Sequence, residues 1–314
     1  MAAYTILSFN GGGIRGLMSS QILLRLVDQF PDLLSQTSMF AGTSAGAAIA
    51  AHLASGGGMT QVEQDAQVAA SAAFFAIPDP LRDRPAYAID LYRDSMRMTY
   101  GDKKLSDLQP IVMTAFDVTV GDPWKPKLFN NVLGDEPDML VYDAVVGSGC
   151  MPGMFGSYTS STGRSLVDGG FVDHDPSVAA IAIAVKSGVP LEEIAMIDIG
   201  TGLMPQSFPL GVDTHTWGAE QWQTFSSPAN FPTLLVNGTP APVLNLSLNG
   251  TFAGVTSHLA SMLLRDRFVS INPRLEGFIA ENDVEGIPEL LKAGNTADLT
   301  EAVALIPRYW GAEV

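Results

Sequence analysis

Ser44 stands at the centre of a Gly-x-Ser-x-Gly motif, which predicts a nucleophilic serine. The motif AGTSAG follows a short apolar segment and precedes a run of small residues with helical spacing. A serine at such a strand–helix turn needs an unusual backbone conformation, and Gly42 and Gly46 let strand and helix approach closely. The start of the following helix also favours negative charge near the hydroxyl group. An ordinary turn rich in Gly and Ser is the alternative interpretation.

Asp168 is a candidate catalytic carboxylate. The segment RSLVDGG places it at the end of an apolar strand, directly before Gly169 and Gly170. In a parallel sheet, ligands and catalytic groups gather at that end of the strands. Taken alone, the segment fits a plain Asp-Gly turn better, but the catalytic interpretation gains weight beside Ser44 and the glycine loop of residues 10–16.

A serine nucleophile needs a base, and histidine is the usual one. The order Ser44, Asp168, His258 matches the Ser…Asp…His order of α/β-hydrolase triads. However, no histidine falls in a recognisable strand-end loop, and His52 lies two turns along the helix that Ser44 opens. We therefore expect surface or polar-core roles for the four histidines, and the triad esterase stays a second hypothesis. They are His52, His174, His215 and His258.

The segment NGGGIRG at residues 10–16 offers a third chemical feature. Gly11, Gly13 and Gly16 fit the G-x-G-x-x-G spacing of a dinucleotide phosphate site. A dinucleotide fold would place an acidic residue at the end of its second strand, whereas here that strand leads into the Ser44 motif. A non-hydrolytic nucleotide-binding module is therefore the weaker hypothesis.

The glycine loop fits an oxyanion hole better. It lies between a strand end and a helix start, so several backbone N–H groups point to one place. We expect the N–H groups of Gly11, Gly12 and Gly13 to stabilise a tetrahedral oxyanion, with Arg15 bracing the loop or adding positive potential.

The elements that must position these residues alternate between strand and helix. Residues 4–9 form a strand bounded by glycine, residues 17–30 show helical spacing up to Pro31, and a second strand, turn and helix follow from residue 38. This alternation is typical of a parallel sheet with crossover helices. We expect further strands over residues 110–120, 125–131, 164–168, 193–199 and 267–273, and further helices over residues 59–109 with a break at 77–85, 142–155, 175–188, 257–264, 284–293 and 299–305.

Length and composition bound the class of protein. The chain has 314 residues, 46% hydrophobic, and we expect one domain over residues 1–314, with a catalytic core at about 1–202 and a loop-rich and helical part at 203–314. No run of about 18 apolar residues and no signal-like N-terminus occurs, so we expect a cytoplasmic protein. A single cysteine, Cys150, excludes an internal disulfide.

The charge balance excludes a polyanionic partner. The formal net charge is −16, and binding to nucleic acid depends on clustered Lys and Arg side chains. Attraction to an anionic membrane is disfavoured for the same reason, so any contact with lipid has to be local and apolar.

Taken together and in this order, the three motifs resemble those of the patatin-like phospholipase family. NGGGIRG corresponds to the family's D-G-G-G-x-R-G loop, Gly42–Gly46 to its G-x-S-x-G, and Asp168–Gly170 to its D-G-[GA]. The segments SGCMPGMF at 148–155 and IDIGTG at 197–202 are also similar to family segments. The resemblance covers most of the chain and is weakest over residues 59–110 and 203–254.

The resemblance implies a three-layer α/β/α sandwich with a mostly parallel sheet and a Ser–Asp dyad without histidine. It makes Ser44 the nucleophile, Asp168 the base and Gly11–Gly13 the oxyanion hole of a lipid acyl hydrolase, a phospholipase A-type enzyme or esterase. The reaction would pass through an acyl-Ser44 ester on a lipid or acyl-ester substrate, with no metal and no organic cofactor.

Two departures from the family pattern concern the activity. Asn10 replaces the usual Asp and can still make an Asx-type hydrogen bond to the loop, but without a charge. DHDP at residues 173–176 stands where N-N-P is usual. A patatin fold with weak catalysis and a regulatory role is therefore a further hypothesis. The helices of residues 59–110 and the stretch after Leu203 are candidate lid or acyl-groove walls, and Met151, Met154 and Phe155 are candidates for its entrance or for core packing.

Overall fold

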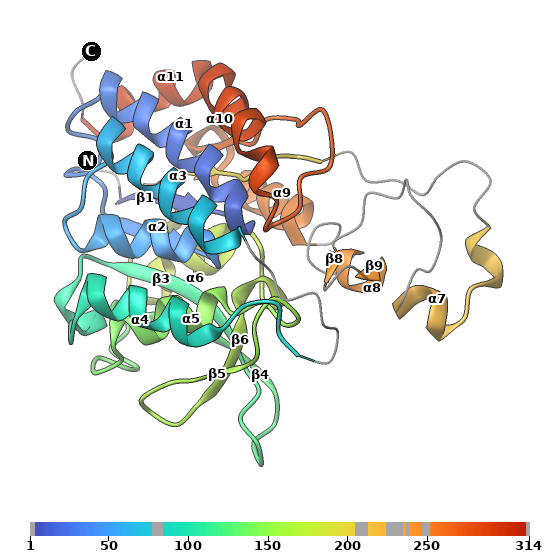
Figure 1. Cartoon of the computed structure of the whole chain (residues 1–314). Helices are drawn as coiled ribbons and strands as arrows, with labels where there is room; N and C mark the ends of the chain where they lie inside the picture. The colour runs from blue at the N-terminus through green and yellow to red at the C-terminus, as the bar shows by residue number, and fades with distance from the viewer. Residues whose placement is uncertain are drawn as a thin grey trace.

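A computed structural model describes residues 4–76, 84–204, 213–223, 235–236, 239–240, 242–246 and 252–311. Its centre is an eight-stranded sheet of order β10-β7-β1-β2-β3-β6-β5, with β4 also paired to β3 (Figure 1). The strands are β1 (Tyr4–Phe9), β2 (Met39–Gly42), β3 (Ile111–Asp117), β4 (Lys125–Asn130), β5 (Tyr158–Thr159), β6 (Ser165–Asp168), β7 (Ile194–Ile199) and β10 (Phe268–Ile271).

Helices cover both faces of this sheet. Alternate residues of β1 point to opposite sides: Leu7 and Phe9 join the larger core cluster, and Ile6 joins a second one. The helices are α1 (Gly16–Gln29), α2 (Ala45–Ala54), α3 (Gln61–Phe75), α4 (Ile89–Tyr100), α5 (Val141–Gly149), α6 (Ser177–Lys186), α7 (Ala219–Gln223), α8 (Pro242–Asn245), α9 (Phe252–Leu264), α10 (Ile287–Thr296) and α11 (Thr300–Tyr309). Helices α6 and α9 pack on the second cluster, whereas α1, α2, α5, α10 and α11 pack on the first.

The fold class predicted from the sequence is therefore confirmed. Five neighbouring strands, β10, β7, β1, β2 and β3, run parallel, and the sheet lies between two helical layers. The C-terminal third shares this architecture, because β10 pairs with β7 and α10 packs against α1. A small separate ladder joins β8 (Leu235–Val236) to β9 (Thr239–Pro240). Within the described ranges no helix has the length and apolar character to span a bilayer.

The direction of β6 differs from the expectation. β6 is antiparallel to β3, with Asp168 opposite Ala115, so Asp168 does not lie at the end of a parallel strand. β2 pairs with the first part of β3 and stops where Gly42 lies opposite Met113. Since β4 occupies the other side of β3 from Val112 to Asp117, β2 and β6 share one side of β3 and meet end to end.

Close approach between β1, β2 and α2 explains two motif glycines. A Cβ atom on Gly46 would lie 2.1 Å from the Phe9 carbonyl oxygen, and one on Gly42 would lie 2.2 Å from the Gly46 carbonyl oxygen. Both distances are far shorter than a van der Waals contact with backbone atoms, which cannot move aside as a flexible side chain can. The first turn of α2 can thus pack on the strand ends only with glycine at both positions.

We expect Gly46→Ala to lower the free energy of unfolding by about 2 kcal/mol or more, because the new methyl group forces α2 away from β1. Urea unfolding followed by circular dichroism measures the change. Gly58→Ala is the matched control, since its Cβ would meet only the carboxylate oxygens of Glu63, at 3.6 and 4.0 Å. Equal stability of the two variants would contradict the packing argument.

Candidate active site

Ser44 occupies the strained turn that its motif predicts. It is the N-cap of α2 with φ 54° and ψ −120°, and only Arg265 shares a positive φ among the described non-glycine residues. Such a conformation costs roughly 1–3 kcal/mol and persists only where the surroundings enforce it. Here Thr43 anchors the turn, because its Oγ1 lies 2.8 Å from Thr114 Oγ1 and 2.9 Å from the Asp173 carbonyl oxygen.

The end-to-end arrangement of β2 and β6 brings Ser44 and Asp168 into direct contact. Ser44 Oγ donates a hydrogen bond of 2.9 Å to Asp168 Oδ2. The other carboxylate oxygen, Oδ1, accepts the Gly170 N–H at 2.7 Å, which orients the carboxyl group. Gly169 is required for this turn, since a Cβ there would lie 2.2 Å from Thr114 Oγ1. The pair can therefore exchange a proton without an intervening group.

The environment of Asp168 suits a base near neutral pH. The side chain is buried, and this burial raises the pKa of Asp168 to about 7. The N–H of Gly170 and the hydroxyl of Ser44 favour the charged form, while the negative charge of Glu281 opposes it. A carboxylate with a pKa near the operating pH combines a useful ionised fraction with enough basicity to accept a proton.

The glycine loop reaches the same place from β1, but Gly11 has to be removed from the predicted donors. The Gly11 N–H donates to the His174 carbonyl oxygen at 2.9 Å, and the Gly11 carbonyl oxygen accepts from Thr201 Oγ1 at 2.6 Å. No acceptor for the N–H groups of Gly12 and Gly13 is found within the described part of the chain. Gly13 lines the same pocket as Ser44.

Positive φ angles and tight packing explain why glycines occupy this loop. Gly12 has φ 152° and Gly13 has φ 57°. A Cβ on Gly12 would lie 2.6 Å from Thr201 Oγ1, and one on Gly13 would lie 2.2 Å from the Glu281 carbonyl oxygen. The loop is thus enclosed by residues far away in sequence, which hold its N–H groups in place.

Arg15 is buried behind this loop. Its Nη1 donates to the Ile279 carbonyl oxygen at 3.1 Å, and its Nη2 lies 3.8 Å from Glu281 Oε1. The Ile14 N–H adds a bond of 2.8 Å to the Glu281 carbonyl oxygen. The loop is therefore held against residues 279–281, and Arg15 places a buried positive charge behind it.

Asn10 does not make the side-chain bond that we expected. Its backbone N–H donates to the Ile199 carbonyl oxygen at 3.1 Å, but the buried side-chain Oδ1 has no hydrogen-bond partner among the described residues. The Asx-type bond to the loop is thus absent from this arrangement, and backbone contacts hold the loop instead.

Three residues at the site were not identified from the sequence as site residues. The Ser44 N–H donates to Ser148 Oγ at 2.8 Å. His174 is buried against Gly11, and burial together with the charge of Arg15 lowers its pKa to about 3, so the imidazole is neutral. The buried Glu281 lines the pocket and lies 3.9 Å from His174 Nε2. Ser148 lies in the segment 148–155, which is similar to a family segment, and His174 lies in the segment 173–176, which departs from the family pattern. No sequence motif marks Glu281.

The structure provides no histidine for a triad. His215 and His258 are exposed, and His52 Nε2 is paired with the Gly58 carbonyl oxygen at 3.1 Å. Within the described part of the chain no imidazole ring is hydrogen-bonded to Ser44 or Asp168, and these two are bonded to each other instead. The predicted Ser44–Asp168–His258 order therefore does not correspond to a spatial arrangement.

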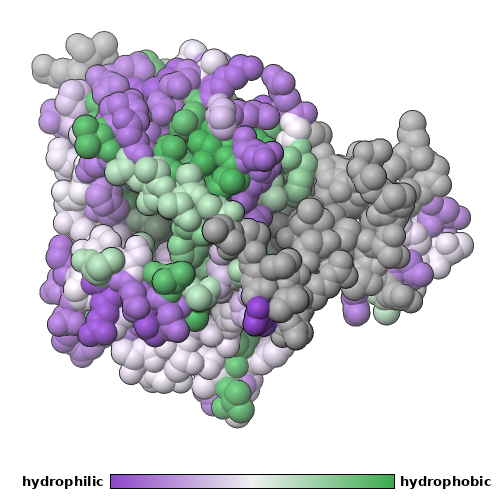
Figure 2. All heavy atoms as spheres, viewed as in Figure 1, coloured by the Kyte–Doolittle hydropathy of each residue, from purple (hydrophilic) through white to green (hydrophobic). Residues whose placement is uncertain are grey.

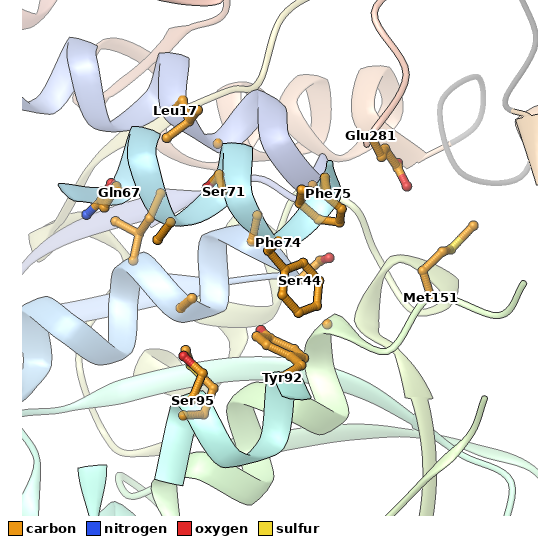
Figure 3. Close-up of a pocket in the computed structure, with 18 of the residues that line it drawn as sticks. Leu17, Ser44, Gln67, Ser71, Phe74, Phe75, Tyr92, Ser95, Met151 and Glu281 are labelled. Carbon is orange, nitrogen blue, oxygen red and sulfur yellow. The ribbon is translucent and has the colours of Figure 1, made fainter. Parts of the chain in front are cut away.

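An apolar pocket of about 350 Å³ adjoins Ser44 (Figure 3). Residues of α2 from Ser44 to His52 line one side, so the pocket follows this helix for about 12 Å. Figure 3 shows Phe74 and Phe75 of α3 and Tyr92 of α4 around Ser44, with Met151 nearby. The helices predicted as groove walls do line this pocket.

Of the two roles predicted for Met151, Met154 and Phe155, core packing is confirmed. Met151, Met154 and Phe155 are buried in an aromatic cluster with Tyr87, and they also line the pocket. The other predicted lid, the stretch after Leu203, lies largely outside the described residues.

An α/β/α sandwich that brings a serine and a buried carboxylate together at one sheet edge defines an α/β protein with a candidate nucleophile–base pair. Comparison with known proteins narrows this class. A family model described as patatin-like phospholipase matches residues 7–181. This chain belongs to the patatin-like phospholipase family, as its motifs predicted.

Relatives match along the whole chain. CotR of Bacillus subtilis (strain 168) is 30% identical over 328 residues, covering 100% of both proteins. Protein Teg of Priestia megaterium is 31% identical and covers 99% of this chain and 100% of Teg. Solved structures are more distant. VipD from Legionella pneumophila aligns with a TM-score of 0.42 and 12% identity over 94% of this chain and 67% of VipD. Human GIVD cytosolic phospholipase A2 aligns with a TM-score of 0.41 and 12% identity, over 97% of this chain and 62% of the phospholipase chain.

The burial of Asp168 predicts a pH-dependent stability. An aspartate in an unfolded chain has a pKa near 4, whereas the pKa of Asp168 in the folded protein is about 7. Between these pH values the folded protein therefore binds the Asp168 proton more tightly than the unfolded chain does. The stability that this proton contributes is lost as the pH rises from about 4 to 7. We expect Asp168→Asn to raise the free energy of unfolding by roughly 1–3 kcal/mol at pH 8 and hardly at all at pH 4. Urea unfolding at both pH values measures this.

The control for this experiment is Asp32→Asn, which changes an exposed carboxylate. It should leave the free energy of unfolding unchanged at both pH values. If Asp168→Asn behaved like this control at pH 8, the cost assigned to the buried carboxylate would be wrong.

Proposed function

We propose that this protein is a lipid acyl hydrolase, an esterase of phospholipase A type, that works through a Ser44–Asp168 dyad. The observation that carries the proposal is the bond of 2.9 Å from Ser44 Oγ to Asp168 Oδ2 at the wall of an apolar pocket. Family membership supports a lipid substrate. The neighbouring glycine loop supports a reaction in which negative charge develops at the attacked carbonyl group.

In the proposed acylation, Asp168 accepts the Ser44 proton as Oγ attacks the ester carbonyl carbon. The resulting oxyanion receives hydrogen bonds from the N–H groups of Gly12 and Gly13. Loss of one such donor in acyl transfer costs about 3–4 kcal/mol. Protonated Asp168 then returns the proton to the leaving alcohol oxygen, and an acyl-Ser44 ester remains.

Deacylation repeats the cycle with water. Asp168 accepts a proton from the water molecule as its oxygen attacks the acyl ester, and Ser44 Oγ leaves with that proton. The free fatty acid is the product, and no step needs a metal or an organic cofactor. The positions of Gly42, Gly46, Gly169 and Gly170 serve this cycle by holding both turns.

The pocket supports an acyl chain as the group that is bound. Its walls are mainly apolar, with Leu17, Ile49 and Phe74 among them. A length of about 12 Å along α2 accommodates roughly ten carbons of an extended chain at about 1.2 Å per bond. We therefore propose an ester of a medium-length or longer fatty acid as the substrate.

Ser44→Ala and Asp168→Asn should each lower kcat/KM for a soluble short-chain ester by about 10³-fold or more, because one removes the nucleophile and the other the base. A spectrophotometric ester assay measures this, and a fluorophosphonate probe should label wild type but not Ser44→Ala. His258→Ala and His215→Ala are the matched controls and should stay within twofold of wild type. Retained turnover in Ser44→Ala would end the proposal, and loss of turnover in His258→Ala would restore the triad.

The rate should follow the ionisation of Asp168. Since the base has to be deprotonated, kcat/KM should rise about tenfold per pH unit below an apparent pKa of about 7 and level off above it. A pH–rate profile from pH 5 to 9 tests this.

Asp173 supplies the control for the pH profile. Burial also raises its pKa to about 7, but its carboxylate is bonded to Thr256 and does not contact Ser44. Asp173→Asn should therefore keep the inflection. If Asp173→Asn abolished it, the inflection would have to be reassigned from Asp168.

A further inference from the structure

The hairpin that joins β3 to β4 extends past the C-terminal end of β2, where Ser44 lies. β2 ends opposite Met113, where the chain turns to Ser44, but β3 continues to Asp117 and the turn of residues 118–124 follows. At about 3.3 Å per residue, the tip of the hairpin lies roughly 20 Å beyond the end of β2 along the strand. In Figure 1 this hairpin is the lowest projection of the molecule.

The tip presents two large apolar side chains to solvent. Val120 is 95% exposed and Trp124 is 75% exposed. The lowest point of Figure 2 is accordingly hydrophobic. Single exposed apolar residues are common on protein surfaces. Here, however, a valine and a tryptophan lie within five residues of each other at the end of a long projection, where neither packs on the body of the protein.

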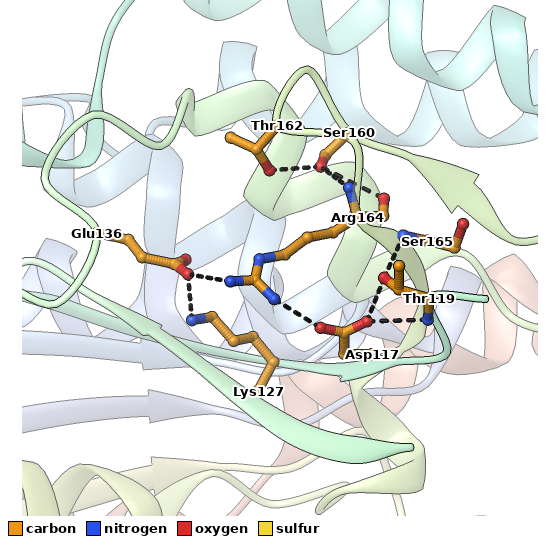
Figure 4. Close-up of polar contacts among 8 residues, drawn as sticks. All are labelled: Asp117, Thr119, Lys127, Glu136, Ser160, Thr162, Arg164 and Ser165. Atoms are coloured by element: carbon orange, nitrogen blue, oxygen red, sulfur yellow. Dashed lines mark hydrogen bonds and ion pairs between the residues drawn. The ribbon is translucent and has the colours of Figure 1, made fainter. Parts of the chain in front are cut away.

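A polar network keeps the hairpin extended (Figure 4). Arg164, next to β6, binds Asp117 Oδ2 at 2.9 Å and lies 3.4 Å from Glu136 Oε1. Lys127 of β4 pairs with the same Glu136 oxygen at 2.5 Å. These contacts all lie at the base of the hairpin. The base of the hairpin is thus locked while its tip stays exposed.

A second set of bonds fixes the start of the turn. Asp117 Oδ1 accepts from the Thr119 N–H at 3.0 Å and from Thr119 Oγ1 at 2.6 Å, and Thr119 Oγ1 accepts the Ser165 N–H at 3.0 Å. The Val118 N–H donates to the Ser165 carbonyl oxygen at 2.8 Å. These bonds connect the hairpin directly to β6, the strand that carries Asp168.

The chemistry of the tip matches a lipid surface. A stable protein–protein interface buries about 800 Å² on each partner, which two side chains cannot supply, whereas a few apolar side chains and an interfacial tryptophan suffice to contact a lipid layer. The net charge of −16 opposes an anionic surface. At the tip, the charge of Lys125 is balanced by that of Asp122.

We propose that Val120 and Trp124 dock this protein on a zwitterionic or neutral lipid layer. The C-terminal ends of the parallel strands, where Ser44 lies, then face the lipid. This inference rests on the proposed function, because a lipid acyl hydrolase has to reach esters at a lipid surface. The hairpin tip is thus a rigidly held apolar contact site that projects from the same end of the sheet as the active site. Its contact is local and does not depend on long-range electrostatic attraction.

Vesicle binding tests the proposal without hydrolysis. Purified Ser44→Ala protein is sedimented with phosphatidylcholine vesicles, and the partition coefficient is compared with that of Ser44→Ala/Val120→Ser/Trp124→Ser. We expect a decrease of at least tenfold in the triple variant, and less than a twofold change of the Ser44→Ala value between 50 and 500 mM salt. Equal partitioning of the two proteins, no binding by Ser44→Ala, or a strong salt dependence would each overturn the proposal.

The matched control is Ser44→Ala/Val185→Ser. Val185 is 44% exposed on the last turn of α6, which leads to the start of β7 and so to the opposite end of the parallel strands from Ser44. This control variant should leave partitioning within twofold of Ser44→Ala. An equal loss in this control would contradict docking through the hairpin. Sedimentation velocity adds a further test: if wild type self-associates and Val120→Ser/Trp124→Ser does not, the tip contacts a second copy and the lipid proposal is wrong.

Turnover of a soluble short-chain ester separates this proposal from the proposed function. Val120→Ser/Trp124→Ser should keep the wild-type rate on the soluble ester and lose at least tenfold on vesicle lipid. A tenfold loss on the soluble ester as well would overturn the docking role. If wild type hydrolysed neither substrate while Ser44→Ala still bound vesicles through the tip, only the proposed function would fail.

Discussion

The meeting of β2 and β6 end to end along one side of β3 is the constraint on which the site depends. β2 stops where Gly42 lies opposite Met113, and β6 arrives from the other direction with Asp168 opposite Ala115. The space between the two ends holds the hydrogen bond from Ser44 to Asp168. The glycines of both turns are necessary because the backbones approach each other so closely there. A serine and a carboxylate separated by 124 residues thus become direct partners.

Burial of charge sets the chemistry at this edge of the sheet and also makes it costly. Burial raises the pKa values of Asp168 and Glu281, and Arg15 compensates only Glu281 directly. On the other side of the sheet, Asp175 and Asp198 are buried with raised pKa values, and each has one carboxylate oxygen without a partner among the described residues. Keeping these carboxylates buried therefore lowers the stability of the folded protein at neutral pH.

Most elements could be predicted from local patterns because local physics determines them. The apolar run of Tyr4–Phe9, the helical spacing after Gly16 and the strand–turn–helix around Ser44 all have the predicted form. The direction of β6 could not be predicted, since an apolar strand before Asp-Gly-Gly reads the same in a parallel or an antiparallel pairing. The prediction that the Gly11 N–H belongs to the oxyanion hole was wrong for a related reason. Its hydrogen-bond acceptor is the carbonyl group of a residue 163 positions away, and no sequence motif predicts such a contact.

By itself, the sequence determined the family, the fold class and the two residues proposed for the chemistry, because tight turns require glycine at set spacings around the serine and the aspartate. Only the tertiary structure decided that these two side chains touch without a histidine between them and that Gly12 and Gly13 keep free N–H groups among the described contacts. It alone brought Ser148, His174 and Glu281 to the site. The physical reason is that spacing encodes the conformation of each turn, whereas contacts between turns depend on how the strands pair.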